Sequence, residues 1–143
     1  MKTLKQIIDT KDIKELLTIS PDQTVLEALI VMAEYKIGAL LVTDKDRMVG
    51  IISERDYARE IILHKKSSKE TLVKEIMTKK VLSLQPSDSF EKGLEVMSEK
   101  KIRHIPVLKG NEIIGMVSQG DLVKEMISHQ KDLISQLEIF IQN

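Results

Sequence analysis

The strongest constraint in the sequence is an internal repeat. Residues 18–66 align without a gap with residues 83–131 at a constant offset of 65, and 15 of the 49 aligned pairs are identical. Two unrelated segments, with ordinary residue usage of roughly 5–7 % per type, would share about three. The chain is therefore a tandem duplication, and a motif that occurs at the same place in both copies carries far more weight than a motif seen once.

The length of the chain limits how the two copies can fold. With 143 residues, the whole chain can bury roughly 68–70 % of its unfolded surface, whereas a single copy of about 50–60 residues would be marginal. We therefore expect one compact domain, or two interlocked small ones that share a core. The sequence divides into residues 1–66 (first repeat with an N-terminal lead-in), 67–80 (linker and short helix) and 81–143 (second repeat with an extended C-terminal helix).

Composition excludes several classes of protein. The 22 basic and 22 acidic side chains balance, which argues against a nucleic-acid-binding protein that relies on a positive field. The chain has no cysteine, so thiol chemistry and Cys-based metal sites are excluded. No apolar run approaches the roughly 18 residues of a membrane span, and the N-terminus lacks the apolar core of a signal peptide. We expect a cytoplasmic protein without a membrane partner.

Each copy predicts the order strand, helix, strand, strand, helix, which is an α/β (α+β) fold. Apolar residues at spacings of three and four define the first helix of each copy, which follows a polar entry. Short helices are also expected at residues 4–8 and 72–77, before each copy. The predicted strands are residues 17–19, 39–43 and 48–52 in copy one, and residues 81–84, 104–108 and 113–117 in copy two. The second helices are predicted from 53 to about 63, and from 118 to about 141.

The last predicted helix is longer than its repeat requires. Met126, Leu133, Leu137 and Ile141 form an apolar stripe with one irregular step. The stripe either packs on the protein's own core or joins two copies of the chain, and the sequence leaves both alternatives open.

One motif ends the second strand of the predicted hairpin in both copies. Gly, two apolar residues, Ser, two further residues and Asp occur at residues 50–56 and 115–121. A Ser three residues before an acid is typical of a helix N-cap, whatever the function. The same junction also offers free backbone N–H groups that suit a phosphate, and a carboxylate one turn further can accept from the two hydroxyls of a ribose. The motif therefore points to a nucleotide.

The doubled unit that ends in this motif resembles a pair of cystathionine-beta-synthase (CBS) domains, over about residues 16–63 and 81–128. Residues 53–59, 73–78 and 102–107 are similar to stand-alone members with two repeats. The resemblance implies two repeats related by a pseudo-two-fold axis, with two clefts that bind adenosine ligands. AMP, ADP or ATP is expected, and S-adenosylmethionine or NAD(H) is less favoured.

The resemblance also implies a role for particular residues. Asp56 and Asp121 would hold ribose hydroxyls, Ser53 and Ser118 would approach phosphate, and the backbone around residues 38–39 and 104–105 would meet the adenine edge. The complete set of expected ligand-binding residues is Thr18, Gly38, Ala39, Ser53, Arg55, Asp56, Ser83, Arg103, His104, Ile105, Pro106, Ser118 and Asp121.

The two clefts are expected to differ. Arg55 of copy one aligns with a glycine, and Arg103 of copy two also aligns with a glycine. Each arginine is either a cation for phosphate or a solvated surface residue. Copy one has Leu41 where copy two has Pro106, and Glu54 adds a negative charge beside Asp56. The Asp121 site therefore fits the family pattern better than the Asp56 site.

The histidines do not predict a metal site. His104 is either a surface residue or a contact to phosphate or ribose, while His64 and His129 fall at or beyond helix ends, where they favour the helix C-terminus. No His-Glu-x-x-His or other closely spaced histidine pair occurs, so no metal is expected.

No set of nucleophile, base and orienting residue can be assembled from the sequence. We expect a non-enzyme that senses an adenosine nucleotide and acts in trans on a protein partner, as a homodimer. A ligand-free scaffold for protein interaction and, less favoured, a nucleotide hydrolase or transferase are the alternatives.

Overall fold

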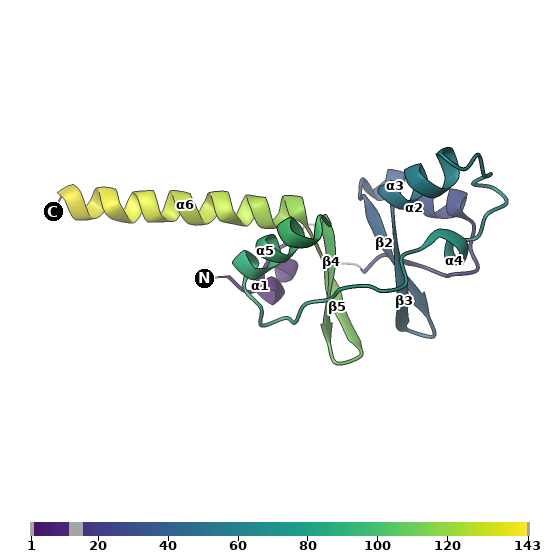
Figure 1. The fold of residues 1–143 in the computed structure, drawn as a ribbon. Helices are drawn as coiled ribbons and strands as arrows, with labels where there is room; N and C mark the ends of the chain where they lie inside the picture. Colours follow the sequence, from purple (N-terminus) through teal and green to yellow (C-terminus); the bar gives the residue numbers. More distant parts are fainter. Residues whose placement is uncertain (1, 12–15, 143) are drawn as a thin grey trace. The chain divides into compact units, whose positions relative to one another are not determined.

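A computed structural model describes residues 2–11 and 16–142, and its residues group into two compact units (Figure 1). The first-repeat unit consists of the described residues of Glu15–Leu82 together with Asn111–Ile113. The second-repeat unit consists of those of Met1–Lys14, Ser83–Gly110 and Ile114–Asn143. The second-repeat unit thus contains the N-terminal segment, which precedes the first repeat in the sequence.

The first-repeat unit is built on a three-stranded sheet. In chain order its elements are β1 (Thr18–Ile19), α2 (Val25–Tyr35), β2 (Ala39–Asp44), β3 (Arg47–Ser53), α3 (Glu54–Tyr57), the π-helical η1 (Ala58–Ile62) and α4 (Val73–Ile76). β1 runs parallel to β2, and β2 runs antiparallel to β3. The predicted strand, helix, strand, strand, helix order is confirmed here.

The β2–β3 hairpin turns through Lys45 and Asp46. Both residues have positive φ angles, 51° and 65°, and Asp44 pairs directly with Arg47. Two central residues with positive φ are typical of the type I′ turn, whose twist matches that of the flanking strands. The turn therefore forms although neither central position is glycine.

The second-repeat unit has a shorter sheet than its sequence predicts. Its elements are α1 (Leu4–Asp9), α5 (Phe90–Lys100), β4 (His104–Lys109), β5 (Glu112–Ser118) and α6 (Gln119–Gln142). β4 and β5 form a two-stranded sheet. The prediction of a strand at residues 81–84 is wrong. The structure has only a single parallel bridge there, between Leu84 and Val107.

The two repeats exchange the short helices that precede them. The α1 backbone N–H of Leu4 donates to the Asp88 carbonyl at 2.8 Å, and the α4 N–H of Val73 donates to the Gln23 carbonyl, also at 2.8 Å. Each lead-in helix thus lies at the start of the other repeat's first long helix. This crossed connection of α1 and α4 agrees with the expected alternative of two interlocked small domains.

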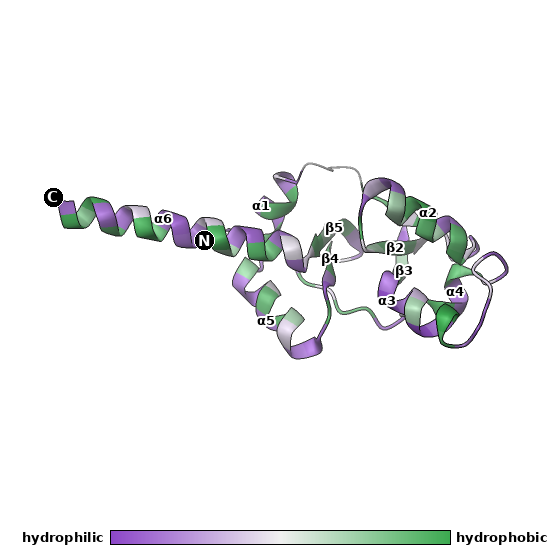
Figure 2. Ribbon diagram, turned by 90° about the horizontal axis from the view of Figure 1, so that it is seen from above, coloured by the Kyte–Doolittle hydropathy of each residue, from purple (hydrophilic) through white to green (hydrophobic). Residues whose placement is uncertain are grey.

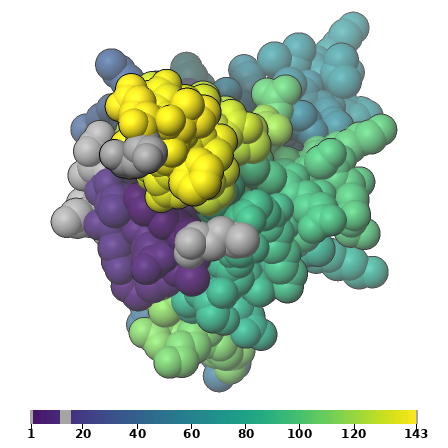
Figure 3. All heavy atoms as spheres, turned by 90° about the vertical axis from the view of Figure 1, so that its left-hand side faces the viewer, coloured from purple at the N-terminus to yellow at the C-terminus, as the bar shows by residue number. Residues whose placement is uncertain are grey.

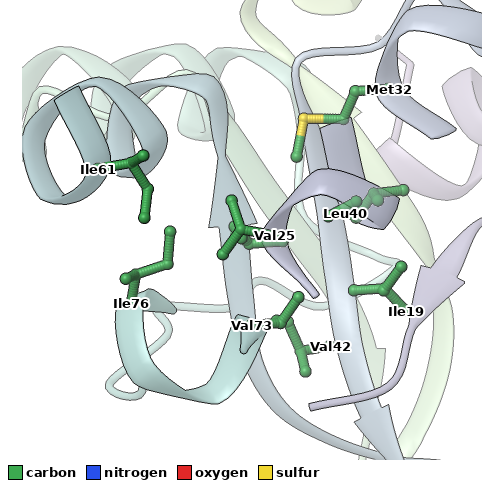
Figure 4. Close-up of a cluster of buried hydrophobic side chains, with 10 residues drawn as sticks. Ile19, Val25, Met32, Leu40, Val42, Ile61, Val73 and Ile76 are labelled. Atoms are coloured by element: carbon green, nitrogen blue, oxygen red, sulfur yellow. The ribbon is translucent and has the colours of Figure 1, made fainter. Parts of the chain in front are cut away.

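The buried apolar side chains form two clusters, one in each unit. In the first-repeat unit, Val73 and Ile76 of α4 pack with residues of β1, α2, β2, β3 and η1 (Figure 4). In the second-repeat unit, Leu4 and Ile7 of α1 pack with residues of α5, β4, β5 and α6. The expected shared core is therefore corrected: each unit has a cluster of its own, completed by a helix from before the other repeat.

The second helix differs between the two copies. In the first repeat the expected helix over 53–63 forms as α3 followed by η1, where the Leu63 N–H donates to the Ala58 carbonyl at 3.3 Å in the i→i−5 pattern of a π-helix. In the second repeat α6 continues as one α-helix of 24 residues. Its C-terminal apolar residues are exposed, for example Leu137 at 60 % and Ile141 at 80 %. The alternative that this stripe packs on the protein's own core is therefore wrong.

Candidate functional site

The two Ser–Asp motifs lie where β3 and β5 end and the following helices begin. In the first repeat, the Ser53 backbone N–H donates to Oδ2 of Asp56 at 2.9 Å, and the Asp56 N–H donates to the Ser53 Oγ at 3.2 Å. The corresponding bonds join Ser118 and Asp121 at 2.8 and 3.1 Å. These reciprocal bonds form the capping box that the sequence predicts, and they fix both carboxylates beside the strand end.

A threonine from the linker joins the first motif. The Thr78 Oγ1 donates to Oδ1 of Asp56 at 3.3 Å, and the Thr78 backbone exchanges two hydrogen bonds with Ile51 of β3, at 2.9 and 3.0 Å. Thr78 follows α4, so the exchange of lead-in helices brings it to this carboxylate. The first-repeat site therefore contains a hydroxyl group that was not among the expected site residues.

A lysine from the N-terminal segment joins the second motif. The Lys11 Nζ lies 3.0 Å from Oδ2 of Asp121 and donates a second bond, also of 3.0 Å, to the carbonyl oxygen of Met116 in β5. Both charged side chains are mostly buried, with exposed fractions of 31 % for Lys11 and 24 % for Asp121. The second-repeat site therefore combines the Asp121 carboxylate with the ammonium of Lys11, a residue that follows α1 in the chain.

The pKa of the Asp121 carboxyl reflects these contacts. Burial is the largest single influence and acts to raise this pKa, because it disfavours the charged form. The Ser118 N–H and the Lys11 ammonium act in the opposite direction, and together they hold the pKa of Asp121 below its ordinary value. Asp121 is therefore ionised at neutral pH and can accept hydrogen bonds from a diol.

His104 belongs to the same cluster of charges. Burial lowers the pKa of its imidazole most, the Asp121 carboxylate acts to raise it, and the Lys11 and Arg103 cations act to lower it. The resulting pKa is below the ordinary value, so the ring is neutral at neutral pH. His104 is half-buried at the start of β4, which does not agree with the alternative of an ordinary surface histidine.

The remaining expected residues of the first repeat lie around the Ser53 junction. Ala39 pairs with Ser53 across β2 and β3, and the Gly38 carbonyl accepts a 3.1 Å hydrogen bond from Glu54. β1 begins at Thr18, which pairs with Leu41, so the described β1–β2 ladder does not extend to Ala39. The Ala39 side chain is fully buried, which leaves its backbone as the part that can meet a ligand.

The second repeat has the same arrangement with different side chains. The Arg103 carbonyl accepts a 2.8 Å hydrogen bond from Gln119 at the start of α6, and the Pro106 carbonyl accepts one of 3.1 Å from Leu84, the residue after Ser83. Ile105 and Pro106 are buried, so they too offer backbone rather than side-chain contacts. Ser83 and Arg103 are exposed.

Arg55 and Glu54 occupy the first turn of α3, where both side chains are exposed. In the second repeat the aligned positions are Gly120 and Gln119, so the junction itself carries no charge apart from Asp121. The cations of the two sites therefore come from different places: from the helix start in the first repeat, and from Arg103 and Lys11 in the second.

The sequence contains only part of the signal that would have found Lys11 and Thr78. Residues 5–8 resemble residues 74–77 at an offset of 69, which indicates equivalent lead-in segments. The hydrogen-bonding pattern confirms the equivalence, because α1 and α4 contact corresponding positions of opposite repeats. What the sequence lacks is any sign of which repeat each lead-in helix joins.

Within residues 2–11 and 16–142, no group of histidine, aspartate or glutamate side chains could hold a metal ion. No helix of this part of the chain has the length and apolar character needed to cross a membrane.

The sequence profile described as "CBS domain" matches residues 6–63 and 73–128. The mitochondrial CBS domain-containing protein CBSX3 of Arabidopsis thaliana is 38 % identical over 126 residues, which cover 85 % of this chain and 61 % of that protein. The chain thus spans less than two thirds of the length of this relative.

Solved structures give the same assignment. A putative signal-transduction protein with CBS domains from Burkholderia ambifaria MC40-6 has a TM-score of 0.86 and 45 % identity, over 90 % of this chain and 96 % of that one. The CBS domain pair of protein MJ0100, solved with 5′-methylthioadenosine and S-adenosyl-L-methionine, shares the fold at a TM-score of 0.78 and 23 % identity, over 90 % and 98 % of the two chains.

These matches define a protein built of two tandem repeats of one domain family. The chain belongs to the CBS domain family, and the expected α+β CBS-pair fold is confirmed.

Proposed function

We propose that this CBS pair is a regulatory sensor of adenosine nucleotides, AMP, ADP or ATP, and that it serves energy sensing. The observation that carries the proposal is the cluster around Asp121. An ionised carboxylate is fixed at a strand end with a lysine ammonium 3.0 Å away, and the His104 imidazole is in electrostatic contact with Asp121, Lys11 and Arg103. A carboxylate that accepts from a diol, next to cations for phosphate, matches the two ends of a nucleoside phosphate.

The proposed binding residues follow the family pattern. Asp56 and Asp121 accept from ribose hydroxyls, and Ser53 and Ser118 lie at the phosphate end. The backbone at residues 38–39 and 104–105 meets the adenine edge, Thr18 assists from β1, and Ser83 assists from the segment before α5. Arg55, Arg103 and His104 supply positive charge or hydrogen bonds to phosphate, and Ile105 and Pro106 contribute backbone contacts.

The cations favour a phosphorylated ligand over a neutral one. The CBS pair of MJ0100 holds 5′-methylthioadenosine and S-adenosyl-L-methionine, neither of which carries a phosphate. In this chain Lys11 lies 3.0 Å from Asp121, and Arg103 acts electrostatically on the neighbouring His104, so a phosphate bound there would gain from both charges. We therefore rank AMP, ADP and ATP above S-adenosylmethionine and NAD(H).

The proposed mode of action is regulation in trans without catalysis. A ligand shifts the balance between two arrangements of a protein only if it binds them with unequal affinity. We propose that nucleotide binding favours one arrangement of the two repeats and that a protein partner recognises it, in the cytoplasm, with the sensor as a homodimer.

Thermal unfolding against AMP, ADP, ATP, NAD, NADH and S-adenosylmethionine tests the proposal. A ligand at about 100 times its dissociation constant adds roughly 2.7 kcal/mol, which for a chain of this size raises Tm by roughly 5–10 °C. Calorimetric titration of the Asp121→Asn variant should show at least tenfold weaker binding, while Asp132→Asn, on the exposed surface of α6, should bind as the wild type. Unchanged affinity in the Asp56→Ala, Asp121→Ala double variant would refute the site assignment.

A ligand-free scaffold for protein interaction is the second candidate. The observation that favours it is that both carboxylates already have protein partners, Thr78 at Asp56 and Lys11 at Asp121. No Tm shift with any adenosine compound would support this candidate against the sensor. Turnover of ATP by the wild type but not by Asp121→Asn would instead support an enzyme.

A further inference from the structure

The exposed part of α6 carries a seven-residue repeat of apolar positions. Starting at Val123, apolar side chains recur at the first, fourth and fifth positions of three successive heptads, with one polar exception, Gln130. We call these residues the α6 stripe: Val123, Met126, Ile127, Gln130, Leu133, Ile134, Leu137, Phe140 and Ile141. Figure 2 shows hydrophobic positions recurring along α6 to its C-terminal end. Such a pattern is typical of a helix that packs along its length against other helices.

The α6 stripe is not the side of the helix that faces its own core. Leu122 is fully buried, Glu125 forms an ion pair with Lys2 at 3.3 Å, and the His129 ring packs on Phe90 at 5.8 Å. At 3.6 residues per turn, these core-facing positions lie on average roughly 100° around the helix from the stripe. The stripe therefore needs a partner from outside the second-repeat unit.

Exposure of the stripe continues along the whole helix. Its apolar members are 36 to 81 % exposed, the least at Val123 and the most at Phe140. Figure 1 shows the C-terminal half of α6 extending past α1 and α5 with no other described segment beside it, and Figure 3 looks toward this end of the helix. Together the exposed apolar surface is on the order of 800 Å², which is about what each partner contributes to a standard protein–protein interface and more than most monomers expose in one patch.

We propose that the α6 stripe binds the α6 stripe of a second copy of this chain, with the two helices antiparallel. The pairing rests on the homodimer named in the proposed function and specifies its interface, but it does not require a bound nucleotide, so its failure can be distinguished from a failure of nucleotide sensing.

Side-chain size favours the antiparallel direction. With full overlap of the three heptads, Val123 faces Phe140 of the second copy, Met126 faces Leu137, and Gln130 faces Leu133. Each facing pair forms one layer of the interface, and it combines a larger with a smaller side chain or two of similar length. The space between the helices is therefore filled evenly along their length. A parallel pair would place Phe140 against Phe140 and Val123 against Val123, which leaves one layer overfilled and another underfilled.

Charge favours the same direction. Lys124 and Glu138 lie on the same edge of the stripe. In the antiparallel pair Lys124 lies beside Glu138 of the second copy, and the contact occurs twice by symmetry. Lys131 at the centre lies near its own counterpart, an exposed like-charge contact that costs little in water. In a parallel pair this edge would face His129 and Gln136, which supply no acidic partner.

The mass in solution tests the pairing. At micromolar concentration and without nucleotide, the wild type should sediment at twice the 16.3 kDa of one chain. The Leu133→Glu, Leu137→Glu variant should sediment as the monomer with an unchanged fold by circular dichroism. The control Ser128→Glu, Ser135→Glu, on the opposite side of α6, should remain dimeric. A monomeric wild type, or a dimer that survives both glutamates in the stripe, would overturn the proposal.

Cysteine pairing tests the direction, because the natural chain has no cysteine. A mixture of Met126→Cys and Leu137→Cys proteins should form a mixed disulfide on mild oxidation, while neither variant should link to itself. In the antiparallel pair, equal positions 126 are about 16 Å apart along the helix, beyond the roughly 7 Å that a disulfide can span between Cα atoms. Efficient self-linking of Met126→Cys would indicate a parallel pair and overturn the antiparallel arrangement.

Discussion

The Lys11 ammonium lies 3.0 Å from the Asp121 carboxylate, although 110 residues separate them in the chain. The contact exists because α1 packs with the second repeat rather than with the first. In the first repeat the equivalent carboxylate, Asp56, receives a neutral hydroxyl from Thr78 instead. The two sites therefore differ in charge through their lead-in segments as well as through their own motifs.

Removing the Lys11 charge should raise the pKa of Asp121. The Lys11→Met variant keeps the length of the side chain but loses the ion pair, so burial is opposed only by the Ser118 hydrogen bonds. Carbon-detected NMR titration of the carboxyl should show the increase.

The same substitution should cost about 1 kcal/mol or less of unfolding free energy at neutral pH, as for a partly exposed ion pair. Because the folded pKa of Asp121 lies below its unfolded value, this stabilisation is present above the unfolded pKa and is lost as pH falls through the folded pKa. Lys74→Met, which removes an exposed pair with Asp22, is the control and should change stability less. An unchanged Asp121 pKa in Lys11→Met would contradict the assignment.

Mild acid should destabilise the fold through His104. Since burial holds the pKa of this imidazole below its ordinary value, the unfolded chain takes up the proton first as pH falls below about 6.5. Stability should therefore fall with decreasing pH, by at most about 1.4 kcal/mol per pH unit from this group. Urea unfolding at several pH values should show the slope.

The His104→Gln variant should lose that part of the pH dependence between about pH 5 and 6.5. His64→Gln, which changes an exposed histidine, should keep it. If the wild type and His104→Gln follow the same pH profile in this range, His104 does not carry the effect.

Gly50 and Gly115 occupy equivalent positions in the two repeats, but they should tolerate an added methyl group unequally. At Gly50 an added Cβ would lie 2.7 Å from the Met77 Sδ and 2.9 Å from the Thr78 carbonyl oxygen, which is backbone and cannot turn aside. At Gly115 the nearest atoms belong to the Ile8 side chain, at 3.1 and 3.2 Å. We expect Gly50→Ala to cost about 1–3 kcal/mol, and Gly115→Ala to cost less.

Gly120→Ala is the matched control, because its added Cβ would meet only the Ser118 Oγ at 3.7 Å. In a helix this change should be neutral or stabilising by up to about 1 kcal/mol. Denaturant unfolding of the three variants gives the order, and a Gly115→Ala variant less stable than Gly50→Ala would contradict the contact analysis.

Truncating a buried residue of α1 should weaken the second repeat. Leu4 is fully buried in the second-repeat cluster, so Leu4→Ala should cost about 2–5 kcal/mol. Hydrogen exchange should accelerate at amides of α5, β4 and β5 more than at those of β2 and β3.

The counterpart is Val73→Ala in α4, whose side chain is fully buried in the first-repeat cluster. This variant should show the reverse distribution of exchange. Acceleration of first-repeat amides by Leu4→Ala would refute the exchange of lead-in helices.

The sequence alone determined the features that depend on neighbouring residues. The hairpin strands, the first helices and the Ser–Asp capping boxes could be predicted because periodicity and capping are local: α2 and α5 form in the predicted place between the start of each repeat and its hairpin, and Ser53 and Ser118 cap as expected. The repeat also made the family visible, since a doubled motif is far less ambiguous than a single one.

Only the tertiary structure decided which lead-in helix joins which repeat. The apolar residues of α1 and α4 can fill either cluster equally well as far as hydrophobicity is concerned, so nothing in the sequence selects the repeat each one completes. The choice depends on contacts between residues far apart in the chain, such as Leu4 with Asp88. That choice brings Lys11 to Asp121 and Thr78 to Asp56, and it thereby gives the two sites their different chemistry.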